Sequence, residues 1–371
     1  METFRSKRAF IMTASSAAVG LGNIFRFPAL AARYGISFIV FYTVALLTVG
    51  LPLLYAELCF GQSRGPSDFG SRVARALCGI NCTAVLCCYT VFFALVLKGA
   101  ATALFSGIAD CAFLLFAAVL AVVCFGSAEK LAKISEIGII FSVSVMLVIS
   151  AIGLIKNPFS TAGLLYPSGR PFSVDFFAAV FGQVFFSLSL AVGVMTAYGS
   201  MLKRGTPLLK SALAVCLADF GISVVSTLVY LCLGGREGTT PDSLAAYPLL
   251  FSSFFGERVG RGVTLFFFLG LAFLCLGSVI AYIKAIAIHS KNQTKAAIFF
   301  ASVSAAVGIL LISDRYERLI YFDQSLLPLI GLFAGATEAI FLSFKVENFK
   351  PLLRFFIPSV LFFLLLRKIF I

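Results

Sequence analysis

Long apolar segments alternate with short polar ones along the whole chain. Eleven of them have about 18 to 28 residues, the length that a tilted helix needs to cross a bilayer. They cover residues 9–32, 37–60, 79–99, 108–125, 134–155, 174–201, 208–233, 262–289, 296–313, 323–344 and 351–371. The pattern predicts an all-α membrane protein with eleven spanning helices.

The first apolar segment contains residues that a continuous membrane helix tolerates poorly. Near its middle stand Gly20, Gly22, Asn23, Arg26 and Pro28. Because unpaired backbone groups are costly in hydrocarbon, an interrupted helix persists there only where it lines a cavity inside the protein. An arginine at membrane depth marks a functional site by default. The segment therefore predicts the unwound helix of a secondary transporter, with free carbonyls for a cation and a half-helix N-terminus for an anion.

A second interruption is predicted in the sixth apolar segment, where Gly182 and Gln183 lead into a serine-containing run that ends at Gly193. Taken alone, such a run is typical of close helix packing. Segments one and six, however, each begin a group of five, and breaks at matching places in two halves indicate an inverted repeat with its site between them. We expect a transporter core over residues 1–345, with its second repeat from about residue 174, and an additional spanning helix over residues 346–371.

Composition agrees with a membrane protein and excludes a soluble globular domain. The chain is 60% hydrophobic and 12% charged, and its mean hydropathy is +1.04. The net charge of +13 reflects membrane orientation and attraction to anionic lipid rather than a nucleic-acid surface. A cytoplasmic N-terminus places 17 Lys and Arg residues inside and 11 outside. We expect a multi-pass protein of a bacterial inner membrane, with the C-terminus outside.

No arrangement of residues in the sequence predicts an enzyme. The single histidine, His289, stands at the end of an apolar segment near Lys284 and Lys291, which is typical of a membrane interface. The sequence contains no nucleotide-binding loop, metal motif or catalytic triad.

The first segment also carries a specific family motif. Residues 18–28 read AVGLGNIFRFP, and they match the first-helix pattern A-V-G-L-G-N-x-x-R-F-P of the neurotransmitter:sodium symporter family, which this chain resembles, at every fixed position. Further similarity lies in GLP at 50–52, Glu57, GQVFFSLS at 182–189, Asp323 and Glu338. The resemblance covers residues 4–344. It implies the leucine-transporter-like fold of five plus five inverted helices, followed by an eleventh.

The resemblance implies a first sodium site made of oxygen ligands. It uses the Ala18 carbonyl, the side chains of Asn23 and Ser187 and, at a position where the family has an amide, Asp219. Oxygen ligands suit a hard cation, and an Asp binds sodium more strongly than an Asn.

A second sodium site is implied as well, but it lacks one ligand. It uses the carbonyls of Ser16, Val19 and Leu274 with the hydroxyl of Ser278. Gly277 stands where the family usually has Thr or Ser. We therefore expect a weakened second site and one or two bound sodium ions.

The resemblance implies an amino-acid site on the broken first helix. The substrate carboxylate of the family lies against the Gly22 amide, the first sodium ion and a hydroxyl matched by Tyr89. Gly20 stands where monoamine carriers have Asp, which indicates that the substrate brings its own carboxylate. Its ammonium group is expected to meet the carbonyls of Ala18, Phe186 and Ser187.

A side-chain pocket and an outer gate complete the implied site. The expected gate is Arg26 with Asp323, near Gln183, and Phe186 is the lid. The pocket is expected to suit a medium apolar or aromatic side chain, and its predicted lining is Val85, Phe186, Ser189, Val192, Ser278 and Tyr282.

Chloride is an ion for which the resemblance and the local charge disagree. The chloride site of animal members is matched by Tyr42, Gln183, Ser187 and Ser223. Asp219 lies one helical turn before Ser223 on the same face, so its carboxylate can supply the negative charge in place of chloride. Two anions about 4 Å apart repel by about 4 kcal/mol even at an effective dielectric of about 20. We expect transport without chloride.

Together these features predict a sodium-coupled symporter that imports a neutral amino acid by alternating access. Two alternatives stay open because Gly277 weakens one ion site and the inner gate is altered. There, residues 1–4 replace an Arg-x-x-Trp motif, Met201 replaces a Tyr, and Arg5 is the candidate substitute. The alternatives are a proton- or weakly sodium-coupled transporter of the same fold and a non-transporting ligand-binding membrane protein. The expected partners are an amino-acid substrate and the lipid bilayer, with no nucleic acid, and the protein is expected to be a monomer or homodimer.

Overall fold

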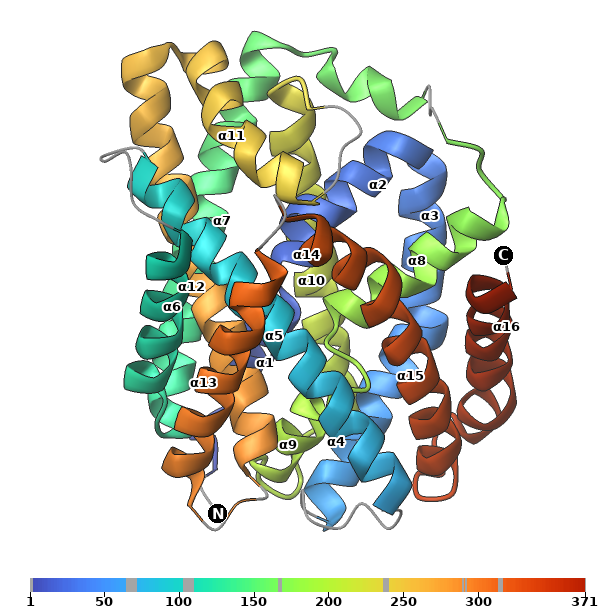
Figure 1. Ribbon diagram of the computed structural model, residues 1–371. Coiled ribbons are helices and arrows are strands. Elements are labelled where there is room, and N and C mark those ends of the chain that lie inside the picture. The colour runs from blue at the N-terminus through green and yellow to red at the C-terminus, as the bar shows by residue number, and fades with distance from the viewer. Residues whose placement is uncertain are drawn as a thin grey trace.

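The computed structural model describes residues 3–64, 72–102, 110–165, 169–235, 240–288, 290, 292–312 and 316–370. Within these ranges the secondary structure is helical and no strand occurs. Most helices run roughly side by side in one bundle, with the N-terminus at one end of it (Figure 1).

Each of the eleven predicted segments contains helix. Among the described residues, six helices are long and apolar enough to cross a membrane alone, and α1 with the helix after it, bent by 60°, makes a seventh. The helices of the eleven segments are, in order, α1 (Lys7–Ala18), η1 (Gly22–Arg26) and α2 (Phe27–Tyr34); α3 (Ile36–Ala45), η2 (Leu46–Gly50) and α4 (Leu51–Arg64); α5 (Arg72–Thr102); α6 (Asp110–Cys124); α7 (Ala128–Lys156); α8 (Val174–Ser187) and α9 (Val194–Ser200); α10 (Leu208–Cys232); α12 (Glu257–Ala287); α13 (Gln293–Leu311); α14 (Glu317–Tyr321), η5 (Phe322–Leu326) and α15 (Leu327–Ser343); and η6 (Leu352–Phe356) with α16 (Ile357–Phe370).

Two further helices, not predicted from the apolar pattern, lie at the end of the bundle away from the N-terminus (Figure 1). They are η3 (Ser160–Leu165) and α11 (Thr240–Phe255). Tyr247 of α11 is fully buried, with its ring centroid 5.3 Å from that of Phe25 in η1 and 5.0 Å from that of Phe267 in α12. Aromatic packing therefore fixes α11 against the broken first helix.

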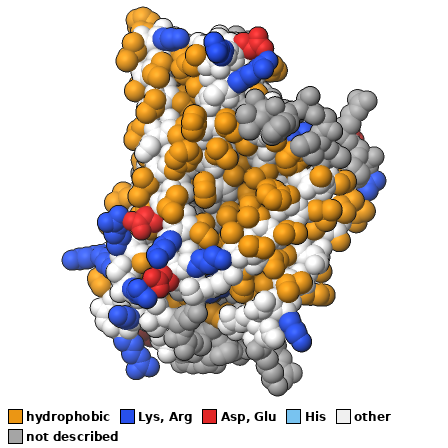
Figure 2. All heavy atoms as spheres, turned by 90° about the vertical axis from the view of Figure 1, so that its left-hand side faces the viewer, with side chains coloured by type: hydrophobic (Ala, Val, Ile, Leu, Met, Phe, Trp, Pro, Cys, Tyr) orange, Lys and Arg blue, Asp and Glu red, His pale blue; other side chains and the backbone are white. Residues whose placement is uncertain are grey.

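The outer surface of the bundle is apolar along its middle. Figure 2 shows hydrophobic side chains across one face, with Lys and Arg gathered toward its ends. Val119 and Val123 of α6 are 58% and 65% exposed, and Phe299 of α13 is 61% exposed. An apolar surface of this extent is stable against lipid but not against water.

The predicted break in the first helix is confirmed. α1 ends at Ala18, and the chain resumes as a π-helical turn at Gly22, a geometry that is frequent at functional sites. Close approach explains both glycines, since a Cβ atom on Gly20 would lie 2.6 Å from the Tyr89 hydroxyl. A Cβ atom on Gly22 would lie 2.6 Å from the Phe186 ring.

The predicted break in the sixth helix is confirmed as well. Between α8 and α9, Ser189, Ala191 and Gly193 have φ angles of 51°, 58° and 76°, a left-handed region that glycine alone adopts without strain. Asn81 of α5 donates to the Ala191 carbonyl at 2.8 Å, and the Ala191 N–H donates to Glu57 of α4 at 2.9 Å. Two side chains from other helices thus hold the unwound segment in place.

Candidate functional site

A buried polar cluster lies beside the break in the first helix. Asn23 stands in η1, Ser187 ends α8, and Asp219 is in α10. The Asn23 amide nitrogen donates to Ser187 Oγ at 2.8 Å and to Asp219 Oδ1 at 2.6 Å, and the Ser187 hydroxyl also donates to Asp219. Ala18, the fourth residue predicted for the first sodium site, is the last residue of α1. The structure therefore brings the three predicted side chains together at a helix end.

The groups predicted from the chloride-site resemblance are engaged with protein oxygens. The Tyr42 hydroxyl donates to Asp219 Oδ2 at 2.7 Å, and the Ser223 hydroxyl donates to the Asp219 carbonyl at 2.9 Å. Gln183 is directed to the first helix, where its Nε2 donates to the Gly22 carbonyl at 2.9 Å. Two of the four groups, Tyr42 and Ser187, therefore donate to the Asp219 carboxylate.

Ser16, Leu274 and Ser278, three of the four residues predicted for the second sodium site, meet where α1 contacts α12. The Ser278 hydroxyl shares its hydrogen bond between the Ser16 carbonyl, at 3.1 Å, and the Leu274 carbonyl, at 3.2 Å. Val19 follows α1 in an extended conformation, with φ −79° and ψ 101°. Gly277 is buried in the same part of α12.

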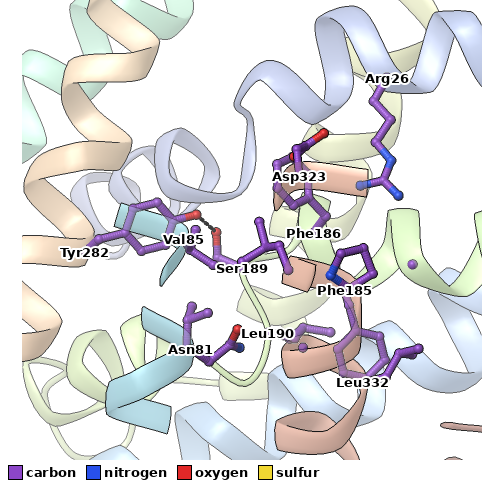
Figure 3. A pocket seen from close by; sticks show the side chains of 15 residues that line it. Arg26, Asn81, Val85, Phe185, Phe186, Ser189, Leu190, Tyr282, Asp323 and Leu332 are labelled. Atoms are coloured by element: carbon purple, nitrogen blue, oxygen red, sulfur yellow. Dashed lines mark hydrogen bonds between the residues drawn. The ribbon is translucent and has the colours of Figure 1, made fainter. Parts of the chain in front are cut away.

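A pocket is lined by residues of η1, α5, α8, α12, η5 and α15, and its wall includes Phe186, the residue before Ser187 of the polar cluster (Figure 3). The Tyr282 hydroxyl of α12 and the Ser189 hydroxyl of the unwound segment point toward one another at 2.9 Å. Ser189 also donates to the Ala17 carbonyl at 2.8 Å. The pocket wall includes five residues of the predicted lining, namely Val85, Phe186, Ser189, Val192 and Tyr282.

Ser278 is a correction to the predicted pocket lining. It is not part of the pocket wall, because its hydroxyl is engaged with carbonyls of α1 and α12. Tyr89 lies behind the wall, with its ring centroid 5.6 Å from that of Phe186 and 5.1 Å from that of Tyr282. The wall also lacks the other described residues predicted to meet the carboxylate or ammonium group, namely Ala18, Gly22 and Ser187.

The predicted gate residues line the pocket together. Arg26 and Asp323 both stand in π-helical turns, η1 and η5, and Arg26 lies over the Phe186 ring at 5.5 Å. The structure therefore places both predicted gate residues on the pocket wall.

The N-terminal end of the bundle is closed by packing. Phe4 is 3% exposed, and its ring centroid is 5.9 Å from that of Tyr198. The Phe4 N–H donates to the Met201 carbonyl at 3.0 Å, so Met201 contributes through its backbone. Arg5 forms a surface ion pair with Glu129 at 2.8 Å.

Several residues of the pocket were not predicted. Asn81, Phe185, Leu190 and Leu332 line it, and Asn81 also anchors the unwound segment. An amide inside an apolar segment was the available signal for Asn81, because polar groups at membrane depth are commonly functional. His289 lies outside the described residues.

Two interrupted helices that meet at a polar cluster and an apolar pocket are typical of secondary membrane transporters. The family model described as the Sodium:neurotransmitter symporter family matches residues 1–113. An uncharacterized sodium-dependent transporter of Bacillus subtilis is 27% identical over 297 residues, covering 71% of this chain and 62% of that protein. Another, of Methanocaldococcus jannaschii, is 26% identical over 348 residues, covering 76% and 68%. The chain is therefore similar to this family over its first 113 residues and to sodium-dependent transporters over most of its length.

The fold matches that of a solved structure. The crystal structure of MhsT in complex with L-phenylalanine is similar with a TM-score of 0.85 and 20% identity, covering 99% of this chain and 100% of that one. The predicted fold class is therefore confirmed, and the chain is an integral multi-pass membrane protein. The chain spans 62% of the length of the Bacillus relative and 68% of the Methanocaldococcus relative.

Proposed function

We propose that this chain is a sodium-coupled symporter that imports a neutral α-amino acid by alternating access. The carrying observation is the buried cluster of Asn23, Ser187 and Asp219 at the end of a broken membrane helix. An ionised carboxylate at membrane depth needs a compensating cation, and the side chains that contact Asp219 here are neutral. Sodium, bound by oxygen ligands, supplies that charge.

The pocket supports a substrate with an uncharged side chain. Its wall is mainly apolar, and Arg26 and Asp323 are the charged residues that line it. The hydroxyl pair of Ser189 and Tyr282 offers one polar contact. MhsT, which shares the fold, is solved in complex with L-phenylalanine, and this supports a medium apolar or aromatic amino acid.

Alternating access is supported by the difference between the two ends of the bundle. Phe4 is packed against Tyr198 at the N-terminal end, whereas Arg26 and Asp323 line the pocket. We infer that the N-terminal end faces the cytoplasm, as the excess of Lys and Arg indicates, and that the gate faces outside. Substrate then enters past the gate, and the Arg26–Asp323 pair closes behind it.

Chloride is not required in this proposal. Tyr42 and Ser187 already donate to the Asp219 carboxylate, so two of the four candidate chloride ligands bond a negative charge that belongs to the protein. A second anion beside this carboxylate would be repelled.

Proton coupling is a second candidate, favoured by a pair of buried carboxylates. Glu338 is 1% exposed, lies against the Cys78 thiol and interacts electrostatically with the fully buried Glu57. One oxygen of Glu57 has no hydrogen-bond partner among the described residues. A proton held by this pair would remove the cost of burying a second negative charge. If protons rather than sodium drive transport, uptake follows an imposed pH gradient in choline medium.

Equilibrium binding of radiolabelled neutral amino acids to the purified protein tests the proposal. We expect binding in sodium chloride and none in choline chloride. Asn23→Ala should weaken sodium and substrate binding together, because coupling between two ligands is reciprocal. The matched control is Asn348→Ala, which removes an exposed amide that bonds the Tyr55 hydroxyl. Equal binding in both salts would contradict sodium coupling.

A further inference from the structure

The hydroxyl that α12 lacks at Gly277 is present, but it comes from another helix. A Cβ atom on Gly277 would lie 2.5 Å from the Ser16 hydroxyl oxygen of α1. The Ser16 hydroxyl therefore occupies the space that a side chain at position 277 would take. The same Cβ atom would lie 3.7 Å from the Ser135 hydroxyl oxygen of α7. Hydroxyls from two neighbouring helices thus converge on Gly277.

These two hydroxyls are buried and unused. Ser16 and Ser135 are each 1% exposed, and neither hydroxyl oxygen has a hydrogen-bond partner among the described residues. Serine hydroxyls in helices commonly bond the carbonyl one turn earlier, as Ser142 does here with Gly138 at 2.7 Å. A buried polar atom that makes no such bond requires an explanation, and a bound ion is one.

The surroundings are rich in neutral oxygen atoms. The Ser16 and Leu274 carbonyls lie within 3.2 Å of the Ser278 hydroxyl, which gives a compact group on the same part of α12 as Gly277. α1 ends at Ala18, so its final carbonyls carry the negative end of the helix dipole. Neutral oxygens at a negative helix end suit a monovalent hard cation.

We propose that the Ser16 hydroxyl, with the Ser135 hydroxyl beside it, replaces the missing α12 hydroxyl as a ligand of the second sodium ion, an inference that rests on the sodium-coupled function proposed above. Ser16 then offers the ion both its carbonyl and its hydroxyl. The second site is therefore rebuilt from α1 and α7 instead of being weakened by Gly277. Its ion connects α1, α7 and α12, so sodium favours the arrangement in which these three helices are packed together.

Relocation of the hydroxyl tests this directly. Ser16→Ala removes the ligand, and Gly277→Ser in that background restores a hydroxyl from α12. The added Cβ has room there, because it would lie 3.7 Å from the Cβ of residue 16. The measurement is thermal unfolding of the purified full chain in sodium chloride titrated against choline chloride at constant ionic strength, since an ion that binds only the folded state raises its stability. We expect the half-maximal sodium concentration to rise about tenfold in Ser16→Ala and to return toward the parental value in the double variant.

Three further variants keep the test specific. Ser135→Ala should raise the half-maximal concentration by a smaller factor. Gly277→Ala alone should resemble Ser16→Ala, because its Cβ displaces the Ser16 hydroxyl and supplies no other. Ser15→Ala is the control, since Ser15 is a buried neighbour whose hydroxyl is not among the atoms nearest Gly277, and it should leave the titration unchanged.

The possible failures are distinguishable. If sodium does not stabilise the parental protein, both the function and the second-site ligands are wrong. If sodium stabilises the parental protein and Ser16→Ala titrates like it, or the double variant is no better than Ser16→Ala, the Ser16 assignment alone is overturned. Unfolding in choline chloride reports whether a variant is folded. If Ser16→Ala does not fold, Ser135→Ala is the deciding variant. A half-maximal sodium concentration in Ser135→Ala equal to that of the parental protein then overturns the assignment.

Discussion

The two candidate sodium sites lie at the same helix break, yet their polar atoms are arranged in opposite ways. At the first site, Asn23, Ser187 and Tyr42 all donate to the carboxylate of Asp219. At the second site, the Ser16 and Ser135 hydroxyls have no partner among the described residues, and the group contains no charged side chain. One site is a connected network around a charge, and the other is a set of separate neutral oxygens.

This difference predicts different roles for the two ions. A network around a fixed carboxylate keeps its shape and attracts a cation strongly. Neutral oxygens from three helices bind a cation only while those helices are together. We therefore expect the first ion to support substrate binding. We expect the second ion to bind only in the arrangement in which α1, α7 and α12 are packed together.

The largest expected effect comes from removing the charge of the first site. Asp219→Asn keeps the size of the side chain but removes its charge and replaces one of the two oxygens that accept from Asn23, Ser187 and Tyr42 with an NH2 donor. We expect uptake in chloride-free medium to fall at least about a hundredfold, because an unbalanced buried polar network costs about 3 kcal/mol or more. We expect either that added chloride restores part of the uptake or that the variant is inactive in both media. Uptake is measured in proteoliposomes with chloride or gluconate.

The control for this variant is Asp175→Asn. Asp175 is an exposed carboxylate, with a side chain 75% accessible, that pairs with Arg367 at the surface. Its replacement should leave uptake unchanged. Parental uptake by Asp219→Asn in gluconate would show that the carboxylate does not substitute for chloride.

The first helix break was predictable because its own residues cause it. Gly20, Gly22 and Pro28 interrupt an apolar run, and both glycines are required by close contacts. The sixth helix break was visible only in part. Ser189 and Ala191 adopt left-handed φ angles that their residue types do not favour. Asn81 and Glu57 hold the backbone of Ala191, and the Ser189 side chain is held by the Ala17 carbonyl and Tyr282, so the contacts come from other helices.

The second sodium site shows the same limit of sequence reasoning. Gly277 read alone predicts a lost ligand. Its space is taken by Ser16, which is 261 positions away in the chain and becomes a neighbour only when α1 packs on α12. Ser278 was assigned to both the pocket and the ion site, and only packing shows that it faces α1.

Gate variants sharpen the comparison because they leave both ion sites intact. We expect Arg26→Ala and Asp323→Ala to lower uptake about tenfold or more while amino-acid binding changes little, since closure over the substrate is lost. Binding and uptake are measured on the same preparation. Arg261→Ala, at an exposed ion pair with Glu257, is the control. Parental uptake by both gate variants would remove the gate assignment.

Asn81→Ala acts on the unwound segment that adjoins the first site. Loss of its hydrogen bond to the Ala191 carbonyl should cost about 1 kcal/mol and weaken amino-acid binding about fivefold. Thr83→Ala, on the same helix, removes only a bond to the Gly79 carbonyl one turn away and serves as the control. Identical dissociation constants for Asn81→Ala and the parental protein would show that the segment holds its shape without this anchor.

The smallest expected effect concerns substrate preference. Tyr282→Phe removes the hydroxyl that bonds Ser189 but retains the ring. We expect a two- to threefold loss, about 0.5 kcal/mol, for amino acids with a polar tip and little change for apolar ones. Competition binding with matched pairs of amino acids measures it, and equal changes for both kinds would exclude a specificity role.

The central claim is that a sodium gradient drives amino-acid uptake through this chain. The most direct measurement is accumulation of radiolabelled neutral amino acids in proteoliposomes after a sodium jump, with choline replacing sodium and gluconate replacing chloride in parallel. The account predicts concentrative uptake with sodium, none with choline, and no loss with gluconate. Uptake that is equal in sodium and choline would contradict it.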